Sequence, residues 1–133
     1  MMEIKARLEL LQTTGTISKE TCVLVERLID ETKTRWGLTL TEENAAALVT
    51  HVAMARDRIL KGDIAAALDP AILAEIKESP AYERAEAIVT DWNNLLDNLL
   101  PEAERGYLLL HLCTLLVQEE NKDAYNCDWR PGR

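Results

Sequence analysis

The sequence lacks several features on which common enzyme classes depend. Its two serines, Ser18 and Ser79, both stand where they would cap a helix. Its five glycines are too few and too scattered to form a phosphate-binding loop for ATP or a dinucleotide. Neither of its two histidines belongs to an HExxH, Glu-x-x-His or His-Asp motif. We therefore expect no enzyme, no cofactor and no bound metal.

Cysteine is also scarce, and its spacing excludes the usual cysteine-based sites. Cys22, Cys113 and Cys127 are far apart and form no CxxC pair, so neither a disulfide framework nor a zinc site is indicated. Cys22 and Cys113 lie in apolar helical stretches, where a free thiol serves as a packing residue. Cys127 is expected to be exposed. Reduced thiols of this kind are typical of a cytoplasmic protein.

The chain has no long hydrophobic run and no excess of positive charge. No segment approaches the roughly 18 consecutive apolar residues that a membrane span requires, and residues 1–10 mix charged with apolar side chains. We expect a soluble protein without a targeting segment or membrane contact. The formal net charge of -8 argues against direct binding of nucleic acid, because that affinity comes largely from clustered lysine and arginine.

What the sequence does contain is helical periodicity. A chain of 133 residues with 47% hydrophobic residues is sufficient for one domain with a sizeable core. Apolar residues recur at helical spacing, and no strand-like alternation competes with them. The sequence predicts an all-α protein: a compact bundle of five principal helices, with a further short helix at the N-terminus. We divide it into an N-terminal helix and turn (1–17), the bundle (18–119) and a flexible tail (120–133).

Local signals predict where the first three helices begin and end. The N-terminal helix is expected over 2–12. Ser18 is a typical N-cap for the second helix, and Gly37 a typical left-handed stop. Residues 39–42 have the Thr-x-x-Glu form of a capping box. This box is expected to begin a long helix that ends at about Lys61.

Prolines mark the beginnings of the remaining helices. Asp69 precedes Pro70, and Ser79 precedes Pro80, which in each case places a cap residue before a proline at the first helical position. Pro101 begins the last helix, which is expected to end at about residue 119. The pattern between residues 63 and 68 does not decide between a continued helix and a separate turn.

The two histidines are the most unusual residues in this pattern. His111 lies in a polar seam of a leucine-rich helix, and His51 lies in the other long helix. Neutral imidazole can attack phosphorus, and a nearby arginine can stabilise the resulting dianion. Arg58 follows His51 by two helical turns, and Glu104 precedes His111 by the same distance. From spacing alone, however, a histidine among helical apolar residues is more often a packing residue, so both interpretations remain open.

Two segments resemble the phosphotransferase-system regulation domain, or PRD, family. Residues 48–62, LVTHVAMARDRILKG, resemble its first histidine helix, with an arginine and a Lys-Gly end after His51. Residues 101–112, PEAERGYLLLHL, resemble its second, in which Glu104 and the Gly106-Tyr107 pair precede His111. Residues 79–88 are similar to the family's middle helix. The resemblance extends over about 18–118.

This resemblance implies a function as well as a helical bundle. It identifies His51 and His111 as phosphorylation sites, with Arg58, Glu104 and Tyr107 as supporting residues. It implies phosphoryl transfer from the histidine phosphocarrier protein or a sugar-specific enzyme II, and regulation of transcription. It also implies a homodimer. Because the chain contains one such domain and no effector module, its output is expected to pass through a separate transcription regulator or through self-association.

One departure from the family pattern affects the choice between the histidines. Many members have an aspartate directly before the first histidine, where this chain has Thr50, and this difference favours His111 over His51 as an acceptor. Two alternatives stay open. The chain could be an interaction module of the same fold that is not phosphorylated. It could also be a small enzyme that uses His51, His111 and Glu104 as acid-base groups or metal ligands.

Overall fold

Six α-helices form the regular secondary structure of residues 3–63, 66 and 68–129, the part of the chain that the computed structural model describes; side chains are described as far as residue 120. This arrangement confirms the predicted all-α class. The helices are α1 (Ile4–Thr13), α2 (Lys19–Trp36), α3 (Glu42–Leu60), α4 (Pro70–Lys77), α5 (Tyr82–Leu95) and α6 (Glu102–Trp129).

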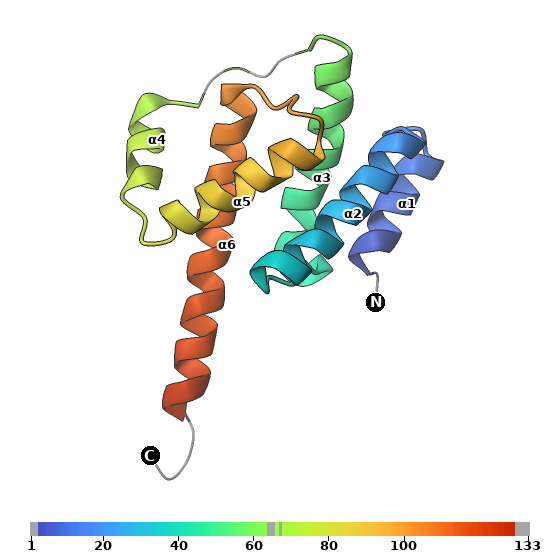
Figure 1. Cartoon of the computed structure of the whole chain (residues 1–133). Coiled ribbons are helices and arrows are strands. Elements are labelled where there is room, and N and C mark those ends of the chain that lie inside the picture. Colours follow the sequence, from blue (N-terminus) through green and yellow to red (C-terminus); the bar gives the residue numbers. More distant parts are fainter. Residues whose placement is uncertain (1–2, 64–65, 67, 130–133) are drawn as a thin grey trace.

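The helices form two groups that meet between α3 and α6. Helices α1 and α2 pack against each other and against α3, whereas α4 and α5 pack against α6 (Figure 1). Direct contacts between α3 and α6, and between α2 and α5, join the two groups. The C-terminal part of α6 extends beyond the other helices (Figure 1). Any residue between α3 and α6 therefore lies at the junction of the whole bundle.

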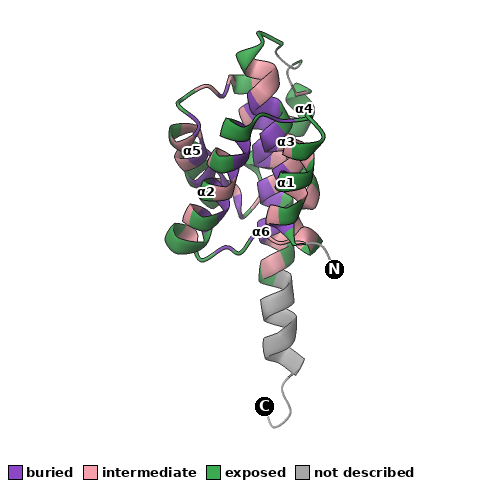
Figure 2. Cartoon of the chain, turned by 90° about the vertical axis from the view of Figure 1, so that its right-hand side faces the viewer, coloured by how far each residue is buried: buried purple, intermediate pink, exposed green. Residues whose placement is uncertain are grey.

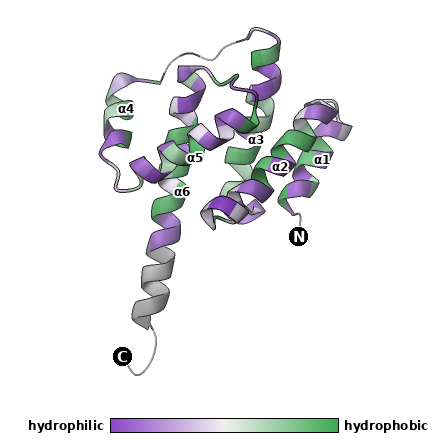
Figure 3. Cartoon of the chain, in the orientation of Figure 1, coloured by the Kyte–Doolittle hydropathy of each residue, from purple (hydrophilic) through white to green (hydrophobic). Residues whose placement is uncertain are grey.

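A continuous apolar core fills the space between the helices. Buried residues line the inward faces (Figure 2), and the hydrophobic residues follow the same faces (Figure 3). Trp92 is the largest fully buried side chain, and its Nε1 donates a hydrogen bond of 2.8 Å to Oγ1 of the buried Thr32. This bond satisfies the indole N–H, which would otherwise be costly to bury.

Most predicted helix ends are confirmed, but the cap of α3 is not the predicted one. Ser18 Oγ accepts from the Thr21 N–H at 3.1 Å, and Gly37 ends α2 with φ of 65°. The predicted box at 39–42 is wrong, because Thr41 is the N-cap. Thr41 Oγ1 accepts from the Asn44 N–H at 3.2 Å, and Asn44 Oδ1 accepts from the Thr41 N–H at 2.8 Å. Asparagine thus takes the role that the prediction gave to glutamate.

The later helices begin close to their prolines. Asp69 caps α4, with its side chain accepting from the Ala71 N–H at 2.8 Å, as predicted. Ser79 instead accepts from the Ala81 N–H at 3.2 Å, which stabilises the turn before α5, so the prediction that it caps this helix is wrong. Helix α6 runs to Trp129, past the predicted end at residue 119. The undecided segment at 63–68 falls partly outside the described residues, and the flexibility of 120–133 stays a prediction.

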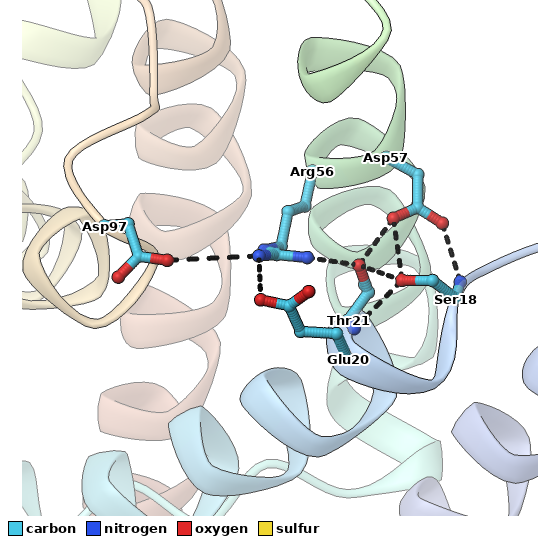
Figure 4. A network of polar contacts seen from close by, with 6 residues as sticks. All are labelled: Ser18, Glu20, Thr21, Arg56, Asp57 and Asp97. Atoms are coloured by element: carbon cyan, nitrogen blue, oxygen red, sulfur yellow. Dashed lines mark hydrogen bonds and ion pairs between the residues drawn. The ribbon is translucent and has the colours of Figure 1, made fainter.

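A buried arginine connects three separate segments near the end of α3 (Figure 4). Arg56 is only 3% exposed, and its Nη1 donates to Thr21 Oγ1 at 2.8 Å. Its Nη2 lies 3.2 Å from Glu20 Oε1 and 3.9 Å from Asp97 Oδ2. Arg56 therefore holds the beginning of α2 and the loop after α5 against α3. That loop leads directly into α6.

The next residue of α3 strengthens the same junction (Figure 4). Asp57 Oδ2 accepts from the Ser18 backbone N–H at 2.8 Å, and Oδ1 accepts from the hydroxyls of Ser18 and Thr21. A carboxylate that accepts several hydrogen bonds is well satisfied without an adjacent cation. Together these contacts fix the C-terminal half of α3, which carries Arg58.

Two further predictions from composition can be compared with the structure. Cys22 and Cys113 are free and buried, as predicted, and burial raises the pKa of both thiols. A raised pKa makes a thiol a weaker nucleophile at neutral pH, which agrees with a packing role. The side chain of Cys127 lies outside the described residues. Within the described part of the chain, no helix is sufficiently long and apolar to cross a membrane.

Candidate functional site

The residues predicted from the two histidine motifs come together between α3 and α6. Helix α3 contributes His51 and Arg58, and α6 contributes Glu104, Tyr107 and His111. The His51 ring centroid lies 5.8 Å from that of His111 and 5.8 Å from that of Tyr107. The structure therefore places both histidines in one site, which we call the α3–α6 site.

Glu104 is the central polar residue of this site. Its Oε2 lies 2.9 Å from His51 Nε2, and its Oε1 accepts from Arg58 Nη2 at 3.2 Å. Sequence spacing placed Glu104 on the same stripe of α6 as His111, whereas the structure directs its carboxylate across the junction to α3. Helical periodicity shows which residues share a face, but it cannot show which residue of another helix faces them.

Several features allow a carboxylate to be buried at this position. The Glu104 side chain is only 1% exposed, and each of its oxygens has a hydrogen-bond partner. Its ion pair with Arg58 compensates for lost hydration, as a buried charge requires. Glu104 also lies in the first turn of α6, where the free backbone N–H groups favour a negative charge.

The groups around Glu104 are accessible, although Glu104 itself is not. The His51 side chain is 25% exposed and that of Arg58 is 40% exposed. A reagent or a partner protein can therefore approach the imidazole and the guanidinium from solvent. The site combines an open nucleophile and an open cation with a buried carboxylate that contacts both.

His111 lies in a partly desolvated environment close to His51. Burial lowers the pKa of His111 below its ordinary value of 6.5, and the proximity of His51 lowers it further. The ring is therefore predominantly neutral at pH 7, which leaves one nitrogen with a free lone pair. A cavity of about 360 Å³ between α3 and α6 adjoins His111, lined among others by Asn44, Ala47 and Gln118.

The residue before His51 points to a different neighbour. Thr50 Oγ1 lies 3.5 Å from Nη1 of Arg7, which also forms an ion pair with Glu42. Thr50 thus contacts α1. The carboxylate that the sequence appeared to lack beside His51 is supplied by Glu104 from α6. Its absence at position 50 is therefore not a reason to prefer His111.

The α3–α6 site does not have the composition of a metal centre. No group of three or more His, Cys, Asp or Glu side chains suited to a metal ion occurs among the residues with described side chains. The two histidines and Glu104 are close together, but Glu104 is already engaged by Arg58, and a cation so near would compete with a metal for the carboxylate.

Comparison with known proteins finds matches that include both histidine helices. The family model described as PRD domain matches residues 26–114, which include the whole of α3 and the part of α6 that carries Glu104, Tyr107 and His111. An uncharacterized protein of Escherichia coli (strain K12), YhfY, is 30% identical over 112 residues, which cover 82% of this chain and 91% of that protein. No solved structure was found to match the chain.

Proposed function

Because the chain belongs to the PRD family, whose members are regulatory domains of the phosphotransferase system, we propose that it senses the activity of that system by reversible phosphorylation of His51 and His111. The observation that carries this proposal is the arrangement of the α3–α6 site. Two histidines lie side by side, and the carboxylate of Glu104 contacts both His51 and Arg58. No catalytic machinery beyond a nucleophile is needed, because the donor protein brings the activated phosphoryl group.

Arg58 suits the role of a phosphate-binding residue. One of its nitrogens, Nη2, is used by Glu104, and the buried Nε has no hydrogen-bond partner among the described residues. A guanidinium has five N–H donors in a planar fork that fits phosphate oxygens. Arg58 can therefore contact a phosphoryl group on a nearby histidine. Tyr107, whose ring lies beside His51, helps to hold that imidazole in place.

Phosphorylation would change the balance of charge at the junction of the bundle. A phosphoryl group adds about -1.5 to -2 charges at pH 7. It would join a buried carboxylate in a site where Arg58 is the cation in contact with that carboxylate. Two unit charges about 7 Å apart interact by about 2 kcal/mol at an effective dielectric constant of about 20. This is comparable to the 1–3 kcal/mol or so of typical couplings between sites, so we expect the packing of α3 on α6 to respond.

The partners in this proposal follow from the chemistry and the family. The donor is the histidine phosphocarrier protein or a sugar-specific enzyme II. The changed packing is passed on through homodimerisation or to a separate transcription regulator. Direct contact with nucleic acid is not part of the proposal, since a net charge of -8 opposes binding to a phosphate backbone.

The experiment uses the fact that the protein has only two histidines. Purified protein is incubated with the phosphocarrier cascade and radiolabelled phosphoenolpyruvate, and acid-labile label is counted. We expect label on the wild type, less on His51→Ala and His111→Ala, and none on the double variant, which contains no histidine at all. Circular dichroism of each variant checks that the helices are retained.

The interaction-module alternative makes the opposite prediction. If the wild type stays unlabelled, and if both alanine variants still bind a partner as the wild type does, the chain acts as an interaction module that is not phosphorylated. Label that persists on the double variant would show that the acceptor is not a histidine, and would refute the proposal.

A further inference from the structure

The hydrogen bond between His51 and Glu104 determines which nitrogen of His51 is free to react. The carboxylate of Glu104 pairs with Arg58 through one oxygen and lies 2.9 Å from His51 Nε2 through the other. An ionised carboxylate has no proton to donate. Nε2 must therefore be the donor, and in the neutral ring the lone pair is then on Nδ1.

We infer that Glu104 holds His51 in its Nε2–H tautomer, so that Nδ1 is the nucleophilic nitrogen of His51 and the atom that receives phosphate. The statement that Nδ1 receives phosphate rests on the proposed function, whereas the assignment of the Nε2–H tautomer does not depend on it. Glu104 is a positioning residue in this inference, since it acts through the imidazole and does not contact the phosphoryl group.

Phosphate on Nε2 is incompatible with the observed surroundings of Glu104. A bond from Nε2 to phosphorus would replace the proton that the carboxylate accepts. It would then place a dianion beside a carboxylate that is only 1% exposed and cannot turn into water. The same carboxylate would lose one of its two hydrogen bonds. Phosphate on Nδ1 leaves the Nε2 proton and both hydrogen bonds of Glu104 in place, and it increases the separation between the two negative groups without removing their repulsion.

The transfer step balances without the loss of a proton. The Nδ1 lone pair forms the new N–P bond while the bond between phosphorus and the phosphate-carrying atom of the donor protein breaks, and that electron pair stays on the donor protein. The His51 ring gains positive character and keeps its proton on Nε2. Glu104 accepts the hydrogen bond from this more acidic N–H, which favours the charged ring. The same logic orients the imidazole in other histidine–carboxylate pairs.

Arg58 completes the arrangement because it holds the other oxygen of Glu104. With Oε1 bound to Arg58 at 3.2 Å, only Oε2 is directed at His51. The tautomer therefore depends on Glu104 first and on Arg58 second. Replacement by leucine at 104 removes the acceptor, whereas glutamine can present either its oxygen or its NH2 group to His51.

The first arm of the test needs no phosphate. Nuclear magnetic resonance of protein labelled with nitrogen-15 in its histidines reports the tautomer of each ring, and His111→Ala identifies the His51 signals. We expect a protonated Nε2 and an unprotonated Nδ1 at pH 8 in the wild type. In Glu104→Leu we expect both tautomers. A wild-type His51 with its proton on Nδ1, or a Glu104→Leu protein that keeps a uniform Nε2–H tautomer, would overturn the inference.

The second arm locates the phosphate after incubation with the phosphocarrier cascade. Coupling between phosphorus and one ring nitrogen identifies the bonded atom, and we expect Nδ1 of His51. Coupling to Nε2 of His51 would overturn the inference while supporting the proposed function. If His51 shows the Nε2–H tautomer but neither histidine takes up phosphate, the proposed function fails and the assignment of the tautomer to Glu104 stands.

Discussion

Replacement of Glu104 by glutamine tests whether the α3–α6 site is held together as the contacts indicate. The substitution keeps the size of the side chain and one acceptor oxygen. It replaces the second oxygen by an NH2 group, which must face either the Nε2–H of His51 or the guanidinium of Arg58. One buried hydrogen bond is then lost and the other is no longer assisted by the carboxylate charge.

The size of the effect follows from these two changes. An unsatisfied buried donor costs about 1–3 kcal/mol, and bonds to charged groups contribute about 1 kcal/mol more than neutral ones. Because the Arg58 side chain is 40% exposed, water compensates for part of its lost contact. We therefore expect Glu104→Gln to lower the free energy of unfolding by about 2 kcal/mol. For a chain of this length, that corresponds to a decrease in Tm of about 8 °C.

Urea unfolding followed by tryptophan fluorescence measures this change, because the buried Trp92 reports on loss of the core. Glu102→Gln is the matched control, since Glu102 is exposed in the same turn of α6 and contributes mainly through the helix dipole. We expect it to cost under about 1 kcal/mol. A double-mutant cycle with Arg58→Gln should give a coupling of at least about 0.5 kcal/mol. The reasoning is refuted if Glu104→Gln is no less stable than Glu102→Gln and the coupling is zero.

Three further changes test other parts of the structure. Acidification from pH 7 should destabilise the wild type more than His111→Gln. Because the pKa of His111 is lowered in the folded protein, the unfolded chain binds more protons between that pKa and about 6.5, and the free energy of unfolding falls as pH falls through this window. The same dependence of stability on pH in both proteins would contradict this. Thr32→Val should cost about 1–3 kcal/mol by leaving the buried Trp92 N–H without its acceptor, whereas Thr114→Val on the exposed face of α6 should change urea stability by under about 0.5 kcal/mol. Ser18→Ala should cost about 1 kcal/mol through loss of the N-cap of α2, and an unchanged denaturation midpoint would show that Asp57 holds this end of α2 without it.

Features that depend on nearby residues could be predicted from the sequence. Ser18, Gly37 and Asp69 determine helix ends through contacts within a few positions of the chain, and apolar periodicity identified all six helices. The shift of the α3 cap from 39–42 to Thr41 and Asn44 shows the limit of such signals. Two overlapping cap motifs compete there, and a pattern of residue types cannot choose between them.

The continuation of α6 was missed for a related reason. Residues 120–129 are mainly polar, which is typical of a tail. However, no glycine or proline interrupts them, and polarity alone does not end a helix. The first residue after position 119 that disfavours a helix is Pro131, and its position predicts the end of α6 better than the change to polar residues does.

The contacts of the α3–α6 site could be predicted only in part. Helical spacing identified His51, Arg58, Glu104 and His111 as residues of interest, the resemblance to the PRD family added Tyr107, and the structure brings these residues together. Glu104 is 53 positions from His51 and 46 positions from Arg58 in the chain, so its contacts with them are non-local. These contacts depend on how α3 lies against α6, which no local pattern contains. The contact of Thr50 with Arg7 on α1 is non-local in the same way.

The central claim is that histidine in the α3–α6 site accepts a phosphoryl group. Intact-mass spectrometry at neutral pH, after incubation with the phosphocarrier cascade, tests it most directly on the wild type and on the histidine-free His51→Ala, His111→Ala variant. We predict that the wild type gains the mass of at least one phosphoryl group, that brief acid treatment removes it, and that the variant gains none. A wild-type mass that does not change on incubation, or a variant that gains the same mass as the wild type, would contradict the account.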